Sequence, residues 1–393
     1  MTRRVLPLAT ASILLSGCAP GDSSSQTAVV RDSAGVLIAE NPSDAAGEEW
    51  ILPSPPVLEI GRGEGQGPGS DLFGAISHAI RLSNGHIAVA DRHAQEIRVF
   101  DDAGDHVLTL GRPGEGPGEF TTLWSIAELA GDTIAAIDPF GGRISLFSSA
   151  GVFSRSFPIP RLPGASAPNV VGWLADGTLL IESLTRSPSR DTRDQSTHFL
   201  YAVDRHGEIL GTLGEYPGSP LGRNGLALGF ASRAEFAAGG SLAWVGQSGR
   251  FELVAHDGTG AVRRIVRLDR DPAAVTQPEI DEAQAAVERS LQGASGPAVE
   301  RILATEPASH HPVHGTLLAD RAGNLWVERY RSHLLADPGP QEWDIFDAEG
   351  RLVGYLATPS DFEITDIGAD FVLGFHTDEL GVQTVRMYRL VRE

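Results

Sequence analysis

The sequence predicts an all-β fold, a six-bladed β-propeller with a small helical insert, and three observations support this prediction. A four-strand module recurs along the chain, and its clearest copy covers residues 81–120. Short runs of alternating apolar and polar residues are separated by Asn-Gly and Ala-Gly turns, a pattern typical of antiparallel hairpins. A strand that resembles the fourth strand of the module also precedes the first copy of the module. This predicts how the ring of blades closes.

The clearest copy of the module shows how each strand is recognised. One strand ends at Leu82 and is followed by the turn Ser-Asn-Gly. Three more strands are predicted at residues 86–90, 96–100 and 106–110, and a glycine-rich link follows the last of them. Four strands and one link are what a single propeller blade requires.

The two ends of the chain are expected to complete one blade together. Val57-Leu58-Glu59-Ile60-Gly61 and the glycine-rich run after it match residues 106–120. Near the C-terminus, three strands are predicted at 365–367, 370–375 and 383–391, with no fourth after them. Pairing the early strand with these three closes the ring and removes the exposed sheet edges.

Between these ends the module repeats with an irregular period, as drifting repeats do. The closure described above supplies the sixth blade. The first five blades are predicted at residues 81–120, 124–157, 170–213, 231–268 and 313–356.

Insertions make the period irregular, and their positions predict where function lies. Residues 184–197 and 329–341 lengthen turns between second and third strands, and residues 276–304 lie between the fourth and fifth blades. In a propeller both kinds of connection emerge on the same face, whereas the turns of the other face stay short. We therefore expect the elaborated face to bind something, because loops on a rigid scaffold carry function.

The insertion at 276–304 is predicted to be helical. Thr276 and Glu279 form a capping box, and Pro278 lies in the first turn. A second helix is predicted at 297–304. The first helix has one apolar stripe, made of Ile280, Ala283, Val287 and Leu291.

The N-terminus has the pattern of an export signal with a lipid attachment site. Arg3 and Arg4 precede an apolar run at 5–15 that is too short to span a bilayer. Leu15-Ser16-Gly17-Cys18 resembles the lipobox of bacterial lipoproteins, which implies cleavage before Cys18 and a lipid on its thiol. Ala19 in place of aspartate favours sorting to the outer membrane.

These signals divide the chain into four predicted regions. Residues 19–28 are small and polar, so they are expected to form a tether, and 29–38 read as a small hairpin outside the repeats. The expected regions are a signal peptide (1–17), a tether that includes the modified cysteine (18–28), an N-terminal hairpin and lead-in (29–56), and the propeller (57–393).

Composition argues against a nucleic-acid partner and against a disulfide framework. The formal net charge of −20 argues against a nucleic-acid partner, because phosphate binding requires clustered Lys and Arg. A single cysteine excludes a disulfide framework. We expect a monomer whose partners are the membrane, through its lipid, and either an envelope protein or a small-molecule ligand.

The blades resemble the NHL-type repeat, in which the second strand reads like Gly-Asn-Ile-Tyr-Val-Ala-Asp. Residues 85–91 and 99–101 fit this pattern closely, and residues 323–328 fit it in part. With its Arg-Asp-Ser-Ala-Gly-Val start at 31–36, the whole chain resembles the six-bladed β-propeller lipoproteins of environmental bacteria. The resemblance implies a fold more than an activity, since one fold hosts many functions.

Four side chains near predicted first strands are candidates for lining the central channel. His78 and His314 lie in such strands, and Glu128 and Arg233 lie near others. Converging imidazoles can hold Zn²⁺ with an open coordination position. Some propeller lyases and lactonases use a channel metal in this way. An ion pair or a bound solute is the alternative for Glu128 and Arg233.

Four carboxylates stand where second strands end, namely Asp91, Asp138, Glu182 and Glu328. They can form a rim of oxygen ligands for Ca²⁺ at the elaborated face. An aspartate at such a position more often accepts hydrogen bonds from the backbone of its own turn, and we favour that interpretation.

The sequence therefore predicts a lipid-anchored envelope protein whose propeller binds a ligand or a protein without catalysis. The alternative is a metal-dependent hydrolase or lyase with its site in the channel. No cofactor is required by the first interpretation, whereas the second requires Ca²⁺ or Zn²⁺.

Overall fold

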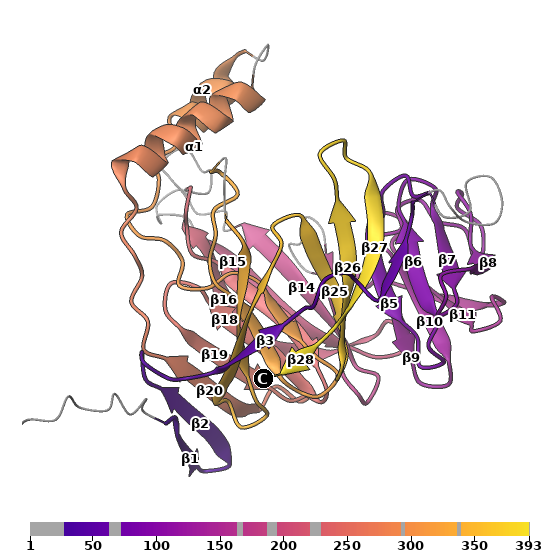
Figure 1. Ribbon diagram of the computed structural model, residues 1–393, viewed down its shortest axis with the longest axis horizontal. Coiled ribbons are helices and arrows are strands. Elements are labelled where there is room, and N and C mark those ends of the chain that lie inside the picture. The colour runs from indigo at the N-terminus through magenta and orange to yellow at the C-terminus, as the bar shows by residue number, and fades with distance from the viewer. Residues whose placement is uncertain are drawn as a thin grey trace, which may run out of the picture.

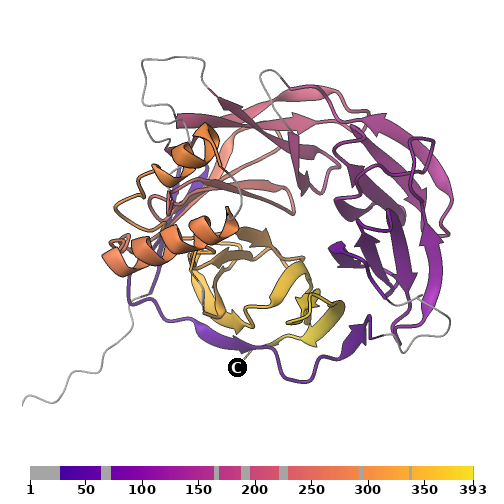
Figure 2. The same cartoon turned by 90° about the horizontal axis from the view of Figure 1, so that it is seen from above.

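Six sheets, each with four neighbouring antiparallel strands, make up the fold, which is a six-bladed β-propeller (Figure 1). Figure 2 shows the ring from above, with the two helices over one side of it. This computed structural model describes residues 27–62, 72–162, 168–186, 195–220, 229–291, 295–335 and 339–392.

The first three blades follow one another along the chain. Blade 1 consists of β5 (Ile76–Arg81), β6 (Ile87–Asp91), β7 (Glu96–Phe100) and β8 (His106–Leu110). Blade 2 consists of β9 (Ser125–Leu129), β10 (Thr133–Asp138), β11 (Arg143–Ser148) and β12 (Phe153–Pro158). Blade 3 consists of β13 (Pro168–Trp173), β14 (Leu179–Arg186), β15 (Gln195–Val203) and β16 (Ile209–Pro220).

Blades 4 and 5 are separated by the helical insert, α1 (Gln277–Ser290) and α2 (Pro297–Leu303). Blade 4 consists of β17 (Ala234–Gly239), β18 (Leu242–Gln247), β19 (Glu252–His256) and β20 (Val262–Leu268). Blade 5 consists of β21 (Leu317–Ala319), β22 (Leu325–Glu328), β23 (Gln341–Phe346) and β24 (Leu352–Thr358).

Blade 6 is assembled from both ends of the chain, as the sequence predicts. β27 pairs in antiparallel fashion with β4, with Val385 opposite Ile60 and Met387 opposite Leu58. The four strands of this blade are β25 (Phe362–Ile367), β26 (Phe371–Thr377), β27 (Gln383–Arg389) and β4 (Leu58–Ile60). The strand that precedes all repeats thus closes the ring.

The segment before β4 forms additional strands on the outside of the ring. β1 (Val29–Ser33) and β2 (Val36–Asn41) form a hairpin, and β2 runs parallel to β20 of blade 4. β3 (Glu48–Ile51) pairs with β24 of blade 5 and with the short β28 (Val391–Arg392). These strands cover the outer edges of the two blades on either side of the insert.

Stacking of the blades explains the apolar pattern of the middle strands. All five residues of β6 are buried, because a blade packs against a neighbour on each of its faces. The outer strand β12 alternates instead between exposed positions and partly or fully buried ones, since one of its sides faces solvent. The apolar clusters accordingly lie between blades, such as the one that joins Trp50, Trp326 and Trp343.

One prediction about a first strand is wrong. The sequence places His314 in the first strand of blade five, but β21 begins only at Leu317. His314 lies in the link before it and has 0% of its surface exposed. It packs on Phe251 with ring centroids 5.6 Å apart, so it is a core residue between blades 4 and 5.

Candidate functional site

The links between blades and the turns between second and third strands lie on one side of the ring, which we call the elaborated face. The helices α1 and α2 stand above it (Figure 1). The connection between β22 and β23 lies there too, and residues 329–335 of it are described. The part of the predicted insertion at 187–194, between β14 and β15, lies outside the described residues.

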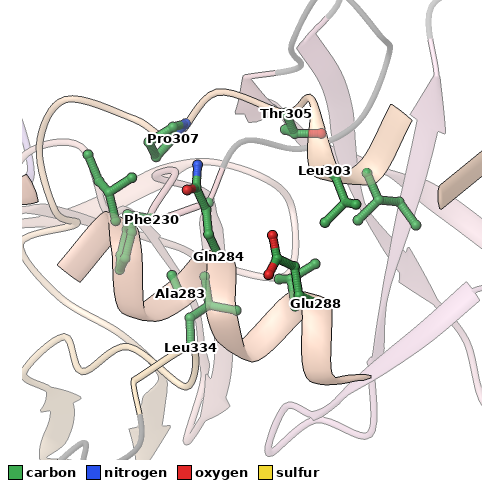
Figure 3. Close-up of a pocket in the computed structure, with 12 residues that line it drawn as sticks. Phe230, Ala283, Gln284, Glu288, Leu303, Thr305, Pro307 and Leu334 are labelled. Atoms are coloured by element: carbon green, nitrogen blue, oxygen red, sulfur yellow. The ribbon is translucent and has the colours of Figure 1, made fainter. Parts of the chain in front are cut away.

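A cavity of 460 Å³ lies between the helix pair and the propeller (Figure 3). Its volume is within the range of roughly 300 to 1,000 Å³ that is typical of small-molecule sites. Apolar side chains form most of its wall, while Gln284, Glu288 and Thr305 contribute polar groups. The apolar lining consists of Phe230, Ile280, Ala283, Val287, Ile302, Leu303, Pro307 and Leu334.

The predicted apolar stripe of α1 explains this cavity. Ile280, Ala283 and Val287 all line it, yet only Ala283 is buried in α1. On α2, Ile302 and Leu303 are 38% and 42% exposed. The helix pair therefore directs apolar surface toward the propeller without filling the space between them.

His311 connects α1 to the propeller. Its Nε2 lies 3.1 Å from Oε1 of Glu279, in the first turn of the helix. Its ring packs edge-on against Phe230, with centroids 5.1 Å apart, and lies 5.7 Å from the ring of Tyr330. The same Glu279 accepts a hydrogen bond from the backbone N–H of Thr276, as the predicted capping box requires.

A second cavity, of 590 Å³, opens at the mouth of the central channel between blades 5, 6 and 1. Unlike the first, it is lined by many polar side chains. These include His78, Glu328, Arg331, His333, Gln341, Asp361, Glu363 and Thr365. The apolar part of its wall consists of Leu318, Trp343, Phe362, Ile364 and Phe375.

The described part of the connection after β22 borders both cavities. Leu334 lines the apolar cavity, whereas Arg331 and His333 line the channel cavity. Arg331 is held by Glu328, whose Oε1 accepts a hydrogen bond from Nε at 3.0 Å. The insertion thus separates two sites of different chemistry on one face.

The four predicted channel residues are not brought together. His78 lies in β5 and lines the channel cavity, and burial lowers its pKa to about 4. Arg233 stands at the elaborated end of β17 and pairs with Glu235, whose pKa is raised by burial. Glu128 lies toward the opposite end of its strand, where it accepts hydrogen bonds from the Ser83 turn.

The carboxylates of Asp91 and Asp138 accept hydrogen bonds from the backbone of neighbouring turns and links. Oδ1 of Asp91 accepts backbone hydrogen bonds from His93 and Ala94, and Oδ2 accepts one from Gly74 at 2.8 Å. Asp138 repeats this pattern one blade later with the backbone N–H groups of Thr121, Thr122 and Gly141. Both residues are fully buried, at 1% and 0% exposure.

Glu182 and Glu328 are also occupied by neighbouring side chains. His198 Nδ1 lies 2.7 Å from Glu182 Oε1 on the adjacent strand of blade 3. Gln341 donates to Glu328 at 3.0 Å, in addition to the contact with Arg331. Within the part of the chain that the structure describes, no three His, Cys, Asp or Glu residues are grouped so that they could hold a metal ion.

Sequence reasoning missed the residues that make the channel cavity polar. Glu363 and Thr365 lie on β25, where the register shifts between Ile364 and Asp366. The sequence pattern does not show which side chains of this strand line the channel. Trp343 reads as an ordinary core residue of a third strand.

Comparison with known proteins defines the class of fold. A family model described as a 6-bladed beta-propeller (DUF5128) matches residues 69–157, which covers blade 1 and nearly all of blade 2. A search of the curated proteins found no match. Among the described residues, no helix is long and apolar enough to cross a membrane.

Solved structures show the same fold over most of the chain. A member of the DUF4221 family from Bacteroides vulgatus has 12% identity and a TM-score of 0.54, covering 88% of this chain and 100% of that one. A Bacteroides fragilis protein described as exported has 14% identity and a TM-score of 0.50, with coverages of 91% and 99%. At these identities the similarity concerns the fold alone.

Proposed function

We propose that this protein is a lipid-anchored propeller of the cell envelope, built from NHL-like repeats, that binds a ligand on its elaborated face without catalysing a reaction. The observation that carries the proposal is the apolar cavity under α1 and α2. Both helices contribute to its wall, and the opposite face of the ring has only short turns.

The chemistry of the cavity favours a small apolar ligand with a polar end. Eight of its lining side chains are apolar, so burial of an apolar ligand drives binding there. Gln284, Glu288 and Thr305 offer hydrogen-bonding groups at the polar part of the wall. The carboxylate of Glu288 disfavours an anionic head group such as a free fatty acid.

A fluorescent apolar amine, N-phenyl-1-naphthylamine, tests this site in the full-length chain with Cys18→Ser, which carries no acyl group. Ala283→Phe fills the cavity and is expected to weaken binding of the probe by about tenfold or more. Ala285→Phe makes the same change at an exposed position of α1 and is expected to leave binding unchanged. Equal binding by both variants refutes the proposed site, and capture of an envelope protein through this face would favour a protein partner instead.

The lipid anchor has a separate test. Cys18 and the lipobox residues Leu15, Ser16 and Gly17 lie outside the described residues, so this part of the proposal rests on the sequence. We expect Cys18→Ser to abolish acylation and to release the protein from the outer-membrane fraction. Unchanged processing and fractionation would refute the anchor without bearing on the cavity.

A further inference from the structure

The helix pair, α1 and α2, stands on a narrow stem. The chain segments that enter and leave it pair in antiparallel fashion at one isolated position, where Ala274 lies opposite His310. Two backbone hydrogen bonds flank this position, donated by Val275 at 3.0 Å and by His311 at 2.8 Å. Such a short pairing resists bending much less than a sheet of several strands, because few backbone groups hold it. The stem alone therefore does not fix the direction of the helices.

Two contacts join the base of the insert to the propeller. Glu279, in the first turn of α1, lies 3.1 Å from the imidazole of His311. After α2, the backbone N–H of Ala308 donates a hydrogen bond to the carbonyl oxygen of Gly229 at 2.8 Å. α1 continues beyond Glu279 as far as Ser290, which places its far end about 16 Å from the first contact. A rotation of α1 about its start therefore moves this far end most.

The helix pair also leaves apolar surface accessible where it lines the apolar cavity (Figure 3). Ile302 and Leu303 of α2 are 38% and 42% exposed. On α1, Ile280 and Val287 line the cavity as well, but Ala283 is the buried residue of this helix. A ligand in the cavity touches both walls fully only if the helices approach it. Closure then buries the apolar surface of ligand and helices together, which favours the closed position.

We propose that α1 and α2 form a lid, which pivots about the Glu279–His311 contact and closes over the apolar cavity when a ligand fills it. The proposal rests on the proposed function, because it concerns access to the same cavity. It adds that one wall of this cavity moves while the propeller stays fixed, as in closure about a hinge.

Distances between pairs of spin labels test the proposal. The sequence has one cysteine, so the full-length Cys18→Ser chain has none and accepts labels at chosen positions. Glu349→Cys places a reference label in an exposed turn of blade 5, on the face opposite the helices. It is combined with Arg289→Cys near the far end of α1 or with Gln277→Cys at its start, both exposed. A control pair combines it with Asp102→Cys, in an exposed turn of blade 1 on the same opposite face.

Without ligand, the distances from position 289 to position 349 should be spread more broadly than those from 277 to 349. Saturation with N-phenyl-1-naphthylamine should shorten and narrow the 289–349 distances by more than any change in the control pair. The 277–349 distances should stay the same, because position 277 lies beside the pivot. Unchanged 289–349 distances with the probe bound, or an equal shift at 277 and 289, overturn the pivoting lid.

Matched variants at neighbouring histidines locate the pivot. His311→Ala removes the contact with Glu279, so the 277–349 distances should spread as broadly as the 289–349 distances. His310→Ala changes an exposed neighbour and keeps the backbone pairing of the stem, so it should leave the 277–349 distances as they are. Equal spreads at 277 in these two variants would contradict the assignment of His311 to the pivot.

The same samples separate the lid from the proposed function. Fluorescence of N-phenyl-1-naphthylamine reports binding in each labelled chain. A bound probe with unchanged distances refutes the lid and keeps the cavity. No binding refutes the cavity of the proposed function, and the ligand-free distances still decide on the pivot: equal spreads at 277 and 289 overturn it, and a broader spread at 289 supports it.

Discussion

At the scale of single residues, buried aspartates stabilise the blades through hydrogen bonds and ion pairs. Asp91 accepts backbone hydrogen bonds from both the turn that follows β6 and the link before β5, and it also pairs with Arg98 at 2.8 Å. The side chains of this ion pair are 1% and 5% exposed. A residue that the sequence offers as a possible metal ligand therefore has a structural role.

Asp91→Ala is expected to destabilise the fold strongly. The change leaves several backbone N–H groups without an acceptor and deprives a buried guanidinium of its main partner, which typically costs about 3 to 5 kcal/mol. Asp102→Ala, at an exposed turn of the same blade, should change the free energy of unfolding by less than about 0.5 kcal/mol. Denaturant unfolding of both variants measures the difference, and similar midpoints would contradict this role.

The buried histidines predict how stability depends on pH. Burial lowers the pKa of His78 and of His314 to about 4, from an ordinary value of 6.5. Both are bases, so between pH 6.5 and 4 the unfolded chain binds more protons than the folded one. The neutral imidazoles contribute fully to the free energy of unfolding above pH 6.5. This contribution is lost as pH falls toward 4, at about 1.4 kcal/mol per pH unit for each residue.

His78→Gln should reduce this slope by the contribution of one histidine. The free energy of unfolding, measured by denaturant titration at several pH values from 4.5 to 7, should fall less steeply with acid in the variant than in the wild type. An unchanged slope would show that His78 is not a buried neutral base in the folded protein.

At the scale of elements, the helical insert is joined to the propeller through few contacts. Glu279 and His311 connect the start of α1 to the body, and Phe230 and Tyr330 pack around the imidazole. Most of α1 is exposed, with Ala283 its one buried residue. The insert is thus expected to open locally at a lower free energy than the blades.

His311→Ala should loosen the insert without unfolding the ring. Limited proteolysis is expected to cut the variant within residues 277–303 faster than the wild type, while the midpoint of global unfolding stays the same. A matched change at His310, an exposed neighbour, should have little effect on the rate of cleavage. Equal cleavage of wild type and His311→Ala would contradict the assignment of His311 as the connecting residue.

At the scale of the whole molecule, ring closure makes the blades interdependent. Ile60 is 3% exposed in the short strand β4, which completes a blade more than 300 residues away in sequence. Ile60→Ala should cost about 2 to 5 kcal/mol, as for core positions within a blade. Its unfolding should remain a single transition by circular dichroism and by tryptophan fluorescence, and early separate loss of blade 6 would contradict cooperative closure.

The closure could be predicted from sequence because Leu58 and Ile60 repeat the pattern of β8 in an unexpected place. The capping box at Thr276 likewise predicted where α1 begins. The channel cavity could not be predicted, because its wall combines Trp343 and Glu363 of blades 5 and 6 with His78 of blade 1, which lies beside them only once the ring has closed. His314 was misplaced because Val313, a buried apolar residue of the link, resembles the start of a strand, whereas β21 begins only at Leu317.

In the function proposed above, the elaborated face binds the ligand. Hydrogen exchange of the full-length Cys18→Ser chain, measured by mass spectrometry with and without N-phenyl-1-naphthylamine, tests it most directly. We expect slower exchange in α1, in α2 and in residues 329–335, with no change in the turns of the opposite face at residues 83–85 and 131–132. Protection confined to those turns, or no protection anywhere, would contradict it.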